Sequence, residues 1–215
     1  MKQILKQYSL LDKFNVSRET YMDFEKFIDM LIKKNDKINI ISKKSAKNDI
    51  IRKRHIIDSA QAIEFVDFNC NTTCDLGTGG GMPGIIIAII IKNLKKKMKI
   101  KLYEKSYHKS NFLREVSREL NLDTEIIKED IFGTTELNSG TIMARAFKPL
   151  PIVLDLVYKN FKSYKNLIIF MGKNGRKILN NSFSNWDFDY KEKESLTSKD
   201  SFLLNIKNLK KKNLN

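Results

Sequence analysis

The sequence is poor in cysteine, histidine and proline. Its 215 residues include two Cys, two His and three Pro. Cys70 and Cys74 do not form a Cys-x-x-Cys pair, and no second pair follows, so we expect no zinc site, no structural disulfide and no bound metal. No Pro- or Gly-rich linker separates one part of the chain from another.

Long hydrophobic runs are also missing. The apolar run Ile85–Ile91 is far shorter than the roughly 20 residues that cross a bilayer. The opening stretch MKQILKQYSLLDKF is amphipathic and does not resemble a signal peptide. We therefore expect a protein of the reducing cytoplasm with no membrane as a partner. We also expect a monomer.

Acidic residues are few in comparison with basic ones. Lys and Arg number 40 and Asp and Glu number 25, which gives a formal net charge of +15. An excess of this size predicts a polyanionic partner such as nucleic acid. The alternative is that a composition rich in Lys, Ile and Asn supplies the charge without any selection for binding. Hydrophobic residues make up 41%, which is enough for a folded core.

The first third of the chain has a helical pattern. After Ser17, a candidate N-cap, apolar side chains recur at helical spacing at Phe24, Phe27, Ile28, Leu31 and Ile32. A second helix is expected over residues 48–66. Short strands then alternate with helices, which predicts a mostly parallel sheet covered by helices. The strands are expected at 72–76, 98–103, 124–128, 141–144 and 167–171, and the helices at 83–94, 106–120 and 149–161.

Residues 185–209 predict two strands joined by a polar loop, which would form an antiparallel hairpin on the edge of the parallel sheet. We therefore expect an α/β, Rossmann-like fold with three parts. Residues 1–66 form an N-terminal helical extension packed on the rest, residues 67–210 form the α/β domain, and residues 211–215 form a basic tail.

The stretch CDLGTGGGMPG, residues 74–84, follows the first expected strand of the α/β domain and precedes its first helix. In open α/β sheets this turn lies at the carboxyl ends of the strands, where ligands bind. Gly79, Gly81 and Gly84 fit the Gly-x-Gly-x-x-Gly pattern of dinucleotide-binding enzymes. The same stretch, read from Asp75 through Gly77, also fits the Asp-x-Gly-x-Gly-x-Gly pattern of S-adenosylmethionine (AdoMet) enzymes. The glycines alone leave both cofactors open.

Two features favour AdoMet. Asp75 would place a carboxylate near the cationic end of AdoMet and would repel a pyrophosphate. Dinucleotide-binding folds also usually open near the N-terminus of a longer chain. Glu104 ends the next expected strand and would accept hydrogen bonds from the ribose hydroxyls of either cofactor. The alternatives are an NAD-binding Rossmann oxidoreductase and a basic RNA-binding protein whose cofactor site has lapsed.

The methyl acceptor can be narrowed by the residues that each reaction needs. Methylation of cytosine carbon typically uses a Pro-Cys nucleophile, and neither cysteine here follows a proline. Methylation of exocyclic amines usually shows Asn/Asp-Pro-Pro-aromatic, where this chain has ARAFKPLP at residues 144–151. Guanine N7 has a free lone pair and no proton, so its methylation requires neither a general base nor a covalent nucleophile.

Five blocks occur in order: KINIIS, RHIIDSA, DLGTGGGMPG, LYEKSYHKSNFLREVSREL and ARAFKPLP. Together they resemble the bacterial 16S ribosomal RNA guanine-N7 methyltransferases of the glucose-inhibited division protein B type, from about residue 20 to residue 175. The resemblance implies a class I AdoMet-dependent methyltransferase fold and AdoMet as methyl donor, with S-adenosylhomocysteine as product. It also implies 16S ribosomal RNA, or a small-subunit ribosomal particle, as the partner.

The candidate site residues follow from these blocks and from their places on the expected sheet. For the cofactor they are Asp75, Gly77, Gly79, Gly81, Met82, Glu104, Ile131, Phe132 and Arg145. By the resemblance, Ile131 and Phe132 would flank the adenine, and Arg145 would also position the target base. For RNA the candidates are Arg54, His55, Lys105, Lys109 and Lys173.

The chain departs from the family pattern at several positions. Met82 stands where an aromatic residue is common, Glu104 replaces Asp, and Met171 replaces a Lys, for which Lys173 is the candidate substitute. Arg54 and Asp58 are about one helical turn apart, so a local ion pair is one interpretation of these charges. The other is that this end of the helix meets the catalytic cleft and helps to orient RNA. We expect Phe112 in the core and Phe147 on a loop that is open to stacking.

Overall fold

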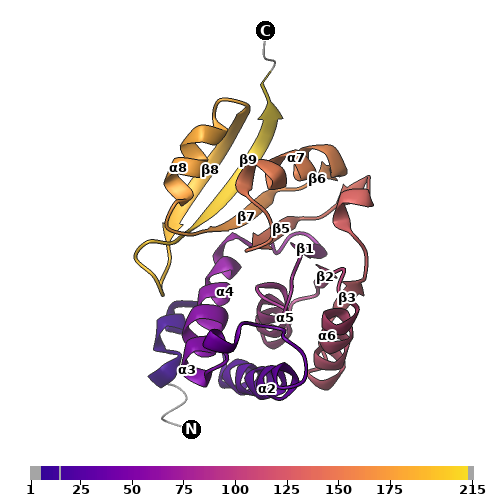
Figure 1. Ribbon diagram of the computed structural model, residues 1–215, viewed down its shortest axis with the longest axis vertical. Coiled ribbons are helices and arrows are strands. Elements are labelled where there is room, and N and C mark those ends of the chain that lie inside the picture. The colour runs from indigo at the N-terminus through magenta and orange to yellow at the C-terminus, as the bar shows by residue number, and fades with distance from the viewer. Residues whose placement is uncertain (1–5, 15, 213–215) are drawn as a thin grey trace.

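The computed structural model describes residues 6–14 and 16–212, and its centre is a seven-stranded sheet (Figure 1). The strand order is β3-β2-β1-β5-β7-β9-β8. The first five strands in that order are parallel, β9 is antiparallel to β7, and β8 is antiparallel to β9. The bounds are β1 Thr72–Leu76, β2 Lys99–Tyr103, β3 Thr124–Ile127, β5 Thr141–Arg145, β7 Asn166–Met171, β8 Trp186–Glu194 and β9 Phe202–Lys211.

This topology confirms the predicted Rossmann-like sheet with an antiparallel hairpin at its edge. The five predicted parallel strands agree with the observed bounds to within one residue at each end. The chain moves outward from β1 to β3 and then returns to place β5 on the other side of β1. The strand order therefore reverses between β1 and β5, and in such sheets ligands bind at this point. A separate small sheet pairs β4 (Leu137–Asn138) with β6 (Phe161–Ser163).

Three predicted helices of the α/β domain are also confirmed to within one residue at each end. They are α5 (Gly84–Asn93), α6 (Tyr107–Glu119) and α7 (Leu150–Asn160). A further helix, α8 (Gly175–Ser182), was not predicted. Because successive side chains of a strand point to opposite faces, the sheet separates two hydrophobic cores. In β5, Met143 packs in the core with α5 and α6, whereas Ile142 and Ala144 pack in the core with α7 and α8.

The N-terminal helical layer begins with η1 (Ser9–Phe14) and α2 (Arg18–Asn35). Ser17 is the N-cap of α2, as predicted, and its hydroxyl accepts a hydrogen bond from Thr20 N. A short turn, η2 (Lys43–Ser45), leads to the second helical segment.

That second segment is not the uniform helix that was expected over residues 48–66. It consists of α3 (Asn48–Ile51), a π-helical turn η3 (Arg52–Ile57), α4 (Asp58–Ala60) and a 3₁₀ turn η4 (Gln61–Phe65). Its predicted buried stripe is nevertheless present, since Ile56, Ala60 and Ile63 are all buried. π-helical turns occur frequently at functional sites, and this one lies beside the pocket described below.

Helix α5 connects the two layers. Its residues Gly84–Ile91 are all buried, and its isoleucines share one core with Phe24, Phe27 and Leu31 of α2. Figure 1 shows α2 to α6 gathered at one end of the molecule and α7, α8 and the β8–β9 hairpin at the other. None of the helices described is both long and apolar enough to cross a membrane.

The expected division of the chain at residue 66 falls between η4 and β1 and stays a prediction. Lys211, in the predicted basic tail, is the last residue of β9, and residues 213–215 lie outside the described part of the chain, as do residues 1–5 of the amphipathic start.

Candidate active site

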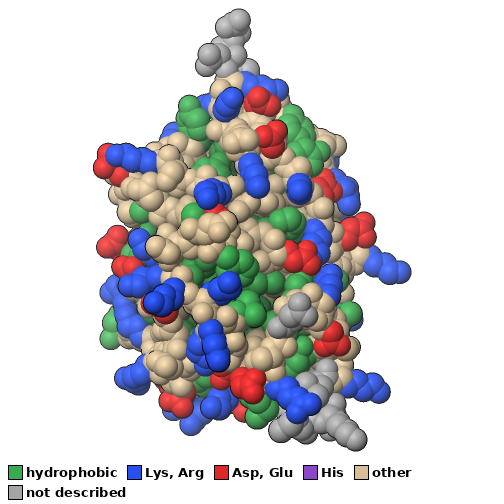
Figure 2. Space-filling model, turned by 180° about the vertical axis from the view of Figure 1, so that it is seen from behind, with side chains coloured by type: hydrophobic (Ala, Val, Ile, Leu, Met, Phe, Trp, Pro, Cys, Tyr) green, Lys and Arg blue, Asp and Glu red, His purple; other side chains and the backbone are tan. Residues whose placement is uncertain are grey.

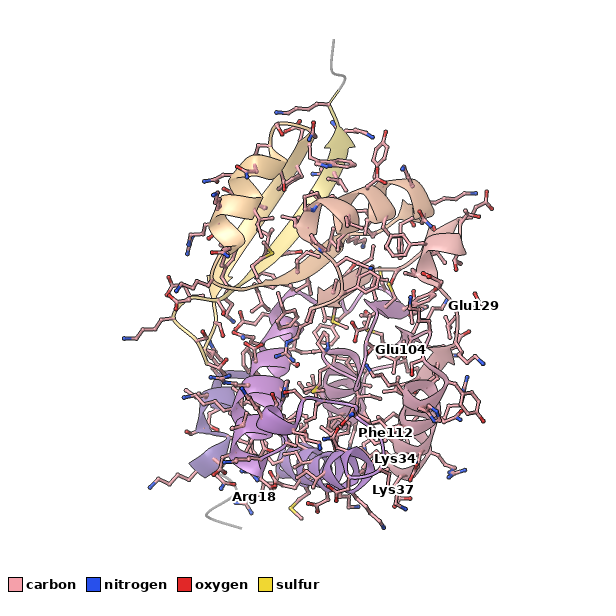
Figure 3. The ribbon with its side chains drawn as sticks, in the orientation of Figure 1. Arg18, Lys34, Lys37, Glu104, Phe112 and Glu129 are labelled. Atoms are coloured by element: carbon pink, nitrogen blue, oxygen red, sulfur yellow. The ribbon has the colours of Figure 1, made fainter. Side chains whose placement is uncertain are left out.

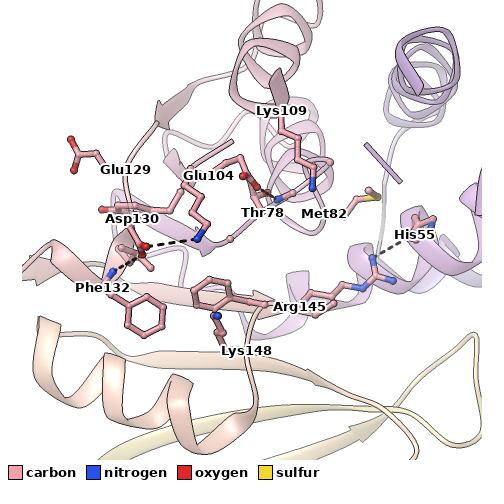
Figure 4. Close-up of a pocket in the computed structure, with 18 residues that line it drawn as sticks. His55, Thr78, Met82, Glu104, Lys109, Glu129, Asp130, Phe132, Arg145 and Lys148 are labelled. Atoms are coloured by element: carbon pink, nitrogen blue, oxygen red, sulfur yellow. Dashed lines mark hydrogen bonds and ion pairs between the residues drawn. The ribbon is translucent and has the colours of Figure 1, made fainter. Parts of the chain in front are cut away.

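A pocket of about 500 Å³ opens at the carboxyl ends of β1, β2, β3 and β5, where the strand order reverses (Figure 4). The structure brings together ten of the fourteen predicted site residues in its lining. They are His55, Gly77, Gly79, Met82, Glu104, Lys105, Lys109, Ile131, Phe132 and Arg145. Asp75, Gly81, Arg54 and Lys173 are not part of this lining.

The loop after β1 requires glycine at Gly77. Its φ is +64°, and a Cβ placed there would lie 2.1 Å from Cδ2 of Phe147. A larger residue would therefore be strained and would displace the ring. Gly77 thus exposes its backbone to the pocket and lets Phe147 pack directly against the loop.

Glu104, at the end of β2, is held by two backbone donors. Gly79 N donates to Oε2 at 2.9 Å and Ser106 N donates to Oε1 at 2.8 Å. Each carboxylate oxygen can accept more than one hydrogen bond, so both retain capacity for further donors such as ribose hydroxyls. Figure 3 shows Glu104 in the middle of the molecule, whereas Phe112 lies against α2 in the core, as expected.

Asp75 and Gly81 lie behind the loop and outside the pocket lining, so their expected contact with a cofactor stays a prediction. Asp75 is fully buried, and its Oδ2 accepts a hydrogen bond from Gly84 N at 2.8 Å. Burial raises the pKa of Asp75 to about 6. At Gly81, a Cβ would point into the packing with Ile85 and Leu113. Both residues therefore lie on the core side of the glycine loop, where they stabilise its conformation.

Arg145, at the end of β5, reaches across the pocket to the N-terminal helical layer (Figure 4). Its Nη2 lies 3.1 Å from Asp58 Oδ2, and the same nitrogen donates to the backbone carbonyl of Arg54. Its Nη1 lies 3.4 Å from Ser59 Oγ and 3.4 Å from His55 Nδ1. Asp58 thus pairs with Arg145, and the local ion pair with Arg54 was the wrong interpretation. The side chain of Arg54 is exposed, and only its carbonyl takes part in this contact.

His55 is electrically neutral in this setting. Burial, and next the positive charge of Arg145, lower its pKa to about 4. With Arg145 donating to Nδ1, the ring proton belongs on Nε2, which is buried and has no hydrogen-bond partner among the described residues. Burial also lowers the pKa of Arg145, while Asp58 and Asp75 raise it. The pocket therefore carries one paired cation and one neutral imidazole on this side.

Two aromatic rings form the opposite part of the pocket. The rings of Phe132 and Phe147 are stacked, with centroids 6.0 Å apart and an interplanar angle of 27°. Asp130 holds the Phe132 backbone by accepting from its N–H, and Lys148 Nζ lies 6.0 Å from the Phe132 ring centroid. Phe132 is 44% exposed although its ring stacks on Phe147, so part of this aromatic surface is open to the pocket.

Lysines border the pocket. Lys105 and Lys109 are part of its lining, and Lys105 Nζ lies 3.9 Å from Asp130 Oδ2. Lys173 is exposed and lines a neighbouring hollow of about 310 Å³, which shares Ala146, Phe147 and Lys148 with the first pocket. Figure 2 shows the face of the molecule that is hidden in Figure 1. Lys and Arg side chains are spread over this face too, among neutral and hydrophobic side chains.

The sequence interpretation missed several residues that line the pocket. Among them, Glu129 and Asp130 follow β3, and Ala146 and Lys148 follow β5. The signal that could have found them is position alone, because residues just after parallel strands share the ligand-binding edge. In the described ranges, no group of three or more His, Cys, Asp or Glu side chains is placed to hold a metal ion.

Comparison with known proteins agrees with this geometry. The family described as rRNA small subunit methyltransferase G matches residues 20–206. Ribosomal RNA small subunit methyltransferase G of Pelagibacter ubique (strain HTCC1062) is 65% identical over 99% of this chain and 100% of its own length. The protein of the same name from Ruegeria pomeroyi is 32% identical over 89% of this chain and 93% of its own.

Among solved structures, a putative O-methyltransferase from Klebsiella pneumoniae has a similar fold, with a TM-score of 0.55, 13% identity, and coverage of 85% of this chain and 90% of that one. The order of the strands, the glycine loop and the match over nearly the whole chain lead to one conclusion: this chain belongs to the rRNA small subunit methyltransferase G family.

Proposed function

We propose that this protein transfers the methyl group of AdoMet to N7 of a guanine in 16S ribosomal RNA. The observation that carries the proposal is the pocket, whose lining combines hydrogen-bonding groups with aromatic rings. The glycine loop and the hydrogen-bonded carboxylate of Glu104 line one side, Phe147 packs against that loop at Gly77, and Phe132 stacks on Phe147. Family membership supports ribosomal RNA as the class of substrate.

The residues present fit AdoMet. Gly77 and Gly79 have positive φ angles and present backbone, without side chains, to the pocket. Glu104 retains lone pairs for the ribose hydroxyls, and Phe132 offers an exposed face for the adenine. When bound, AdoMet supplies an electrophilic methyl group on its sulfonium.

The chain's own residues have little proton chemistry to perform. Guanine N7 is a lone pair without a proton, so the protein needs to position the base and to tolerate the positive charge that methylation creates. Arg145 can donate to the guanine edge, and its own charge is already offset by Asp58. His55 is neutral and adds no charge to the site. The aromatic face of Phe147 suits a cationic base.

The lysines around the pocket support an RNA partner. Lys105, Lys109 and Lys148 line it, and Lys173 extends the basic rim into the neighbouring hollow. Contacts of this kind bind phosphates and set affinity without reading sequence. We further expect the protein to act in the cytoplasm as a monomer and to require no metal.

The central experiment is to map N7-methylguanosine in ribosomal RNA from cells with and without this gene. We expect one methylated guanine of 16S ribosomal RNA to disappear and to return when the gene is restored. Purified protein should methylate one of three substrates best: naked RNA, a precursor particle or the finished subunit. Comparing the methylation rates of the three identifies the substrate. An unchanged map in the two strains would refute the proposal.

Two experiments address the two alternatives that the sequence left open, an oxidoreductase and an RNA-binding protein with a lapsed site. The first is calorimetric titration of the purified protein with each cofactor. We expect saturable binding of AdoMet and S-adenosylhomocysteine and none of NAD, since family membership favours a methyltransferase over an oxidoreductase. For an RNA-binding protein with a lapsed site, Gly77→Asp would change neither RNA binding nor RNA modification. We expect Gly77→Asp to retain RNA binding and to abolish methylation.

A further inference from the structure

The loop between β8 and β9 reaches across the molecule to Asp58. Ser195 Oγ donates to Asp58 Oδ1 at 2.9 Å, and Thr197 Oγ1 donates to the same oxygen at 3.1 Å. These partners are 137 and 139 residues apart along the chain. In Figure 1 the loop lies at the end of the hairpin that faces the N-terminal helical layer. The C-terminal hairpin is therefore connected directly to the segment that holds Arg145.

The two oxygens of Asp58 have separate partners. Oδ1 accepts from Ser195, from Thr197 and, at 2.9 Å, from Gln61 Nε2, whereas Oδ2 lies 3.1 Å from Arg145 Nη2. The side chains of Asp58 and Arg145 are only 15% and 17% exposed. Charge-assisted hydrogen bonds are strong and directional when water is largely excluded. The carboxylate is thus fixed on one edge and presents its other edge to the guanidinium.

The loop is itself ordered by further contacts at the same place. Leu196 N donates to Gln61 Oε1 at 3.2 Å, and Thr197 N donates to Ser195 Oγ at 3.1 Å. Gln61 is fully buried. Other hydroxyls in the loop take no part, since the hydroxyls of Ser198 and Ser201 are hydrogen-bonded to each other at 3.3 Å. The contacts to Asp58 therefore belong to a defined network and not to a generally polar surface.

We infer that the β8–β9 loop, acting through Asp58, is a positioning element for Arg145 in the methylation reaction. Three hydroxyl and amide donors hold Asp58, and Asp58 holds the direction of the guanidinium while it offsets its charge. This inference rests on the proposed function. Its consequence is that Ser195, Thr197 and Asp58 are positioning residues, because Arg145 lines the pocket and they do not.

The first test needs no RNA and reads the orientation of Arg145. Restricted rotation of the guanidinium should give separate ¹⁵Nη signals for Arg145 in the wild type. In the double variant Ser195→Ala/Thr197→Val the signals should merge, while in the control Ser198→Ala they should stay separate. If the double variant is too unstable to study, the single variant Ser195→Ala takes its place. Its two ¹⁵Nη signals should lie closer together than those of the wild type. Unchanged signals in the double variant would overturn the inference, whatever the activity of the protein.

The second test is kinetic. We expect kcat/KM for RNA methylation to fall about tenfold in Ser195→Ala/Thr197→Val, the scale of one hydrogen bond to a charged group. The dissociation constant of S-adenosylhomocysteine should change less than twofold. The hydroxyl-retaining swap Ser195→Thr/Thr197→Ser should recover most of the rate, and Ser198→Ala should behave as the wild type. An equal rate in the double variant and in Ser198→Ala would contradict the inference, whereas an inactive wild type would instead refute the proposed function.

Discussion

Replacing Asp75 by asparagine should change how the stability of the protein depends on pH. Burial raises the pKa of Asp75 from its usual 3.8 to about 6, a shift of about 2 units. At about 1.4 kcal/mol per unit, ionising this buried group costs the folded state about 3 kcal/mol. The folded protein holds the proton more tightly than the unfolded chain does, so this stability is complete below pH 3.8 and is lost as the pH rises through 6.

About half of that loss, roughly 1.4 kcal/mol, falls between pH 5 and pH 8. Asparagine cannot ionise, and its amide oxygen can still accept from Gly84 N. The free energy of unfolding of Asp75→Asn, relative to that of the wild type, should therefore rise by about 1.4 kcal/mol from pH 5 to pH 8.

The assay is urea denaturation of both proteins at pH 5, 6, 7 and 8. Asp29→Asn is the matched control, since Asp29 is exposed on α2 and has no hydrogen bond or ion pair in the described part of the chain. Its difference from the wild type should stay constant with pH. If the difference for Asp75→Asn is equally constant, Asp75 does not carry a raised pKa and the reasoning fails.

Three further predictions concern the pocket. Gly77→Ala places a Cβ 2.1 Å from the Phe147 ring at a φ of +64°. We therefore expect the free energy of unfolding to fall by about 1–2 kcal/mol and AdoMet to bind at least tenfold more weakly in calorimetry. Wild-type affinity for AdoMet would contradict this prediction. Glu104→Gln replaces one acceptor oxygen by an NH₂ group, which cannot accept from a backbone N–H or a ribose hydroxyl, and should weaken AdoMet binding by about tenfold while the far-ultraviolet circular dichroism stays unchanged. Unaltered binding would exclude the ribose contact. His55 has its pKa lowered to about 4 in the folded protein, so stability is complete above pH 6.5 and falls by up to about 3 kcal/mol as the pH drops toward 4. His55→Gln should remove that part of the acid loss in denaturation curves, and an unchanged acid profile would show that His55 does not titrate in this way.

Much of the fold could be predicted from the sequence because its signals are local. The strand Thr72–Leu76 was predicted with its observed bounds, since turn residues and an abrupt change of period mark its ends. The glycine loop was likewise recognised from its spacing, and ten predicted residues do line the pocket. In an α/β sheet, a strand followed by a glycine-rich turn and a helix fixes where that turn must lie.

The features that the sequence did not reveal depend on contacts between distant segments. Arg54 and Asp58 have the spacing of a helical ion pair, yet Asp58 pairs with Arg145, 87 positions further on, because β5 ends beside this helix. Asp75 fits a cofactor motif, yet its side chain turns inward to Gly84. Helix α8 is short and mostly polar, so its periodic signal was weak, although Gly175, Leu179 and Ser182 are buried.

The all-round burial of α5 has a consequence for how this protein can be divided. A helix of the sequence GIIIAIIIKN has no polar face, and α2 covers the side that the sheet leaves open. Removing residues 1–66 would uncover a contiguous strip of isoleucine, a surface that associates with itself in water. We therefore expect a fragment that begins at residue 67 to aggregate even though it contains nearly every residue of the pocket. We expect the smallest unit that stays in solution to include both layers, so a substitution that loosens α2 from α5 should lower the amount of active protein although it lies outside the pocket.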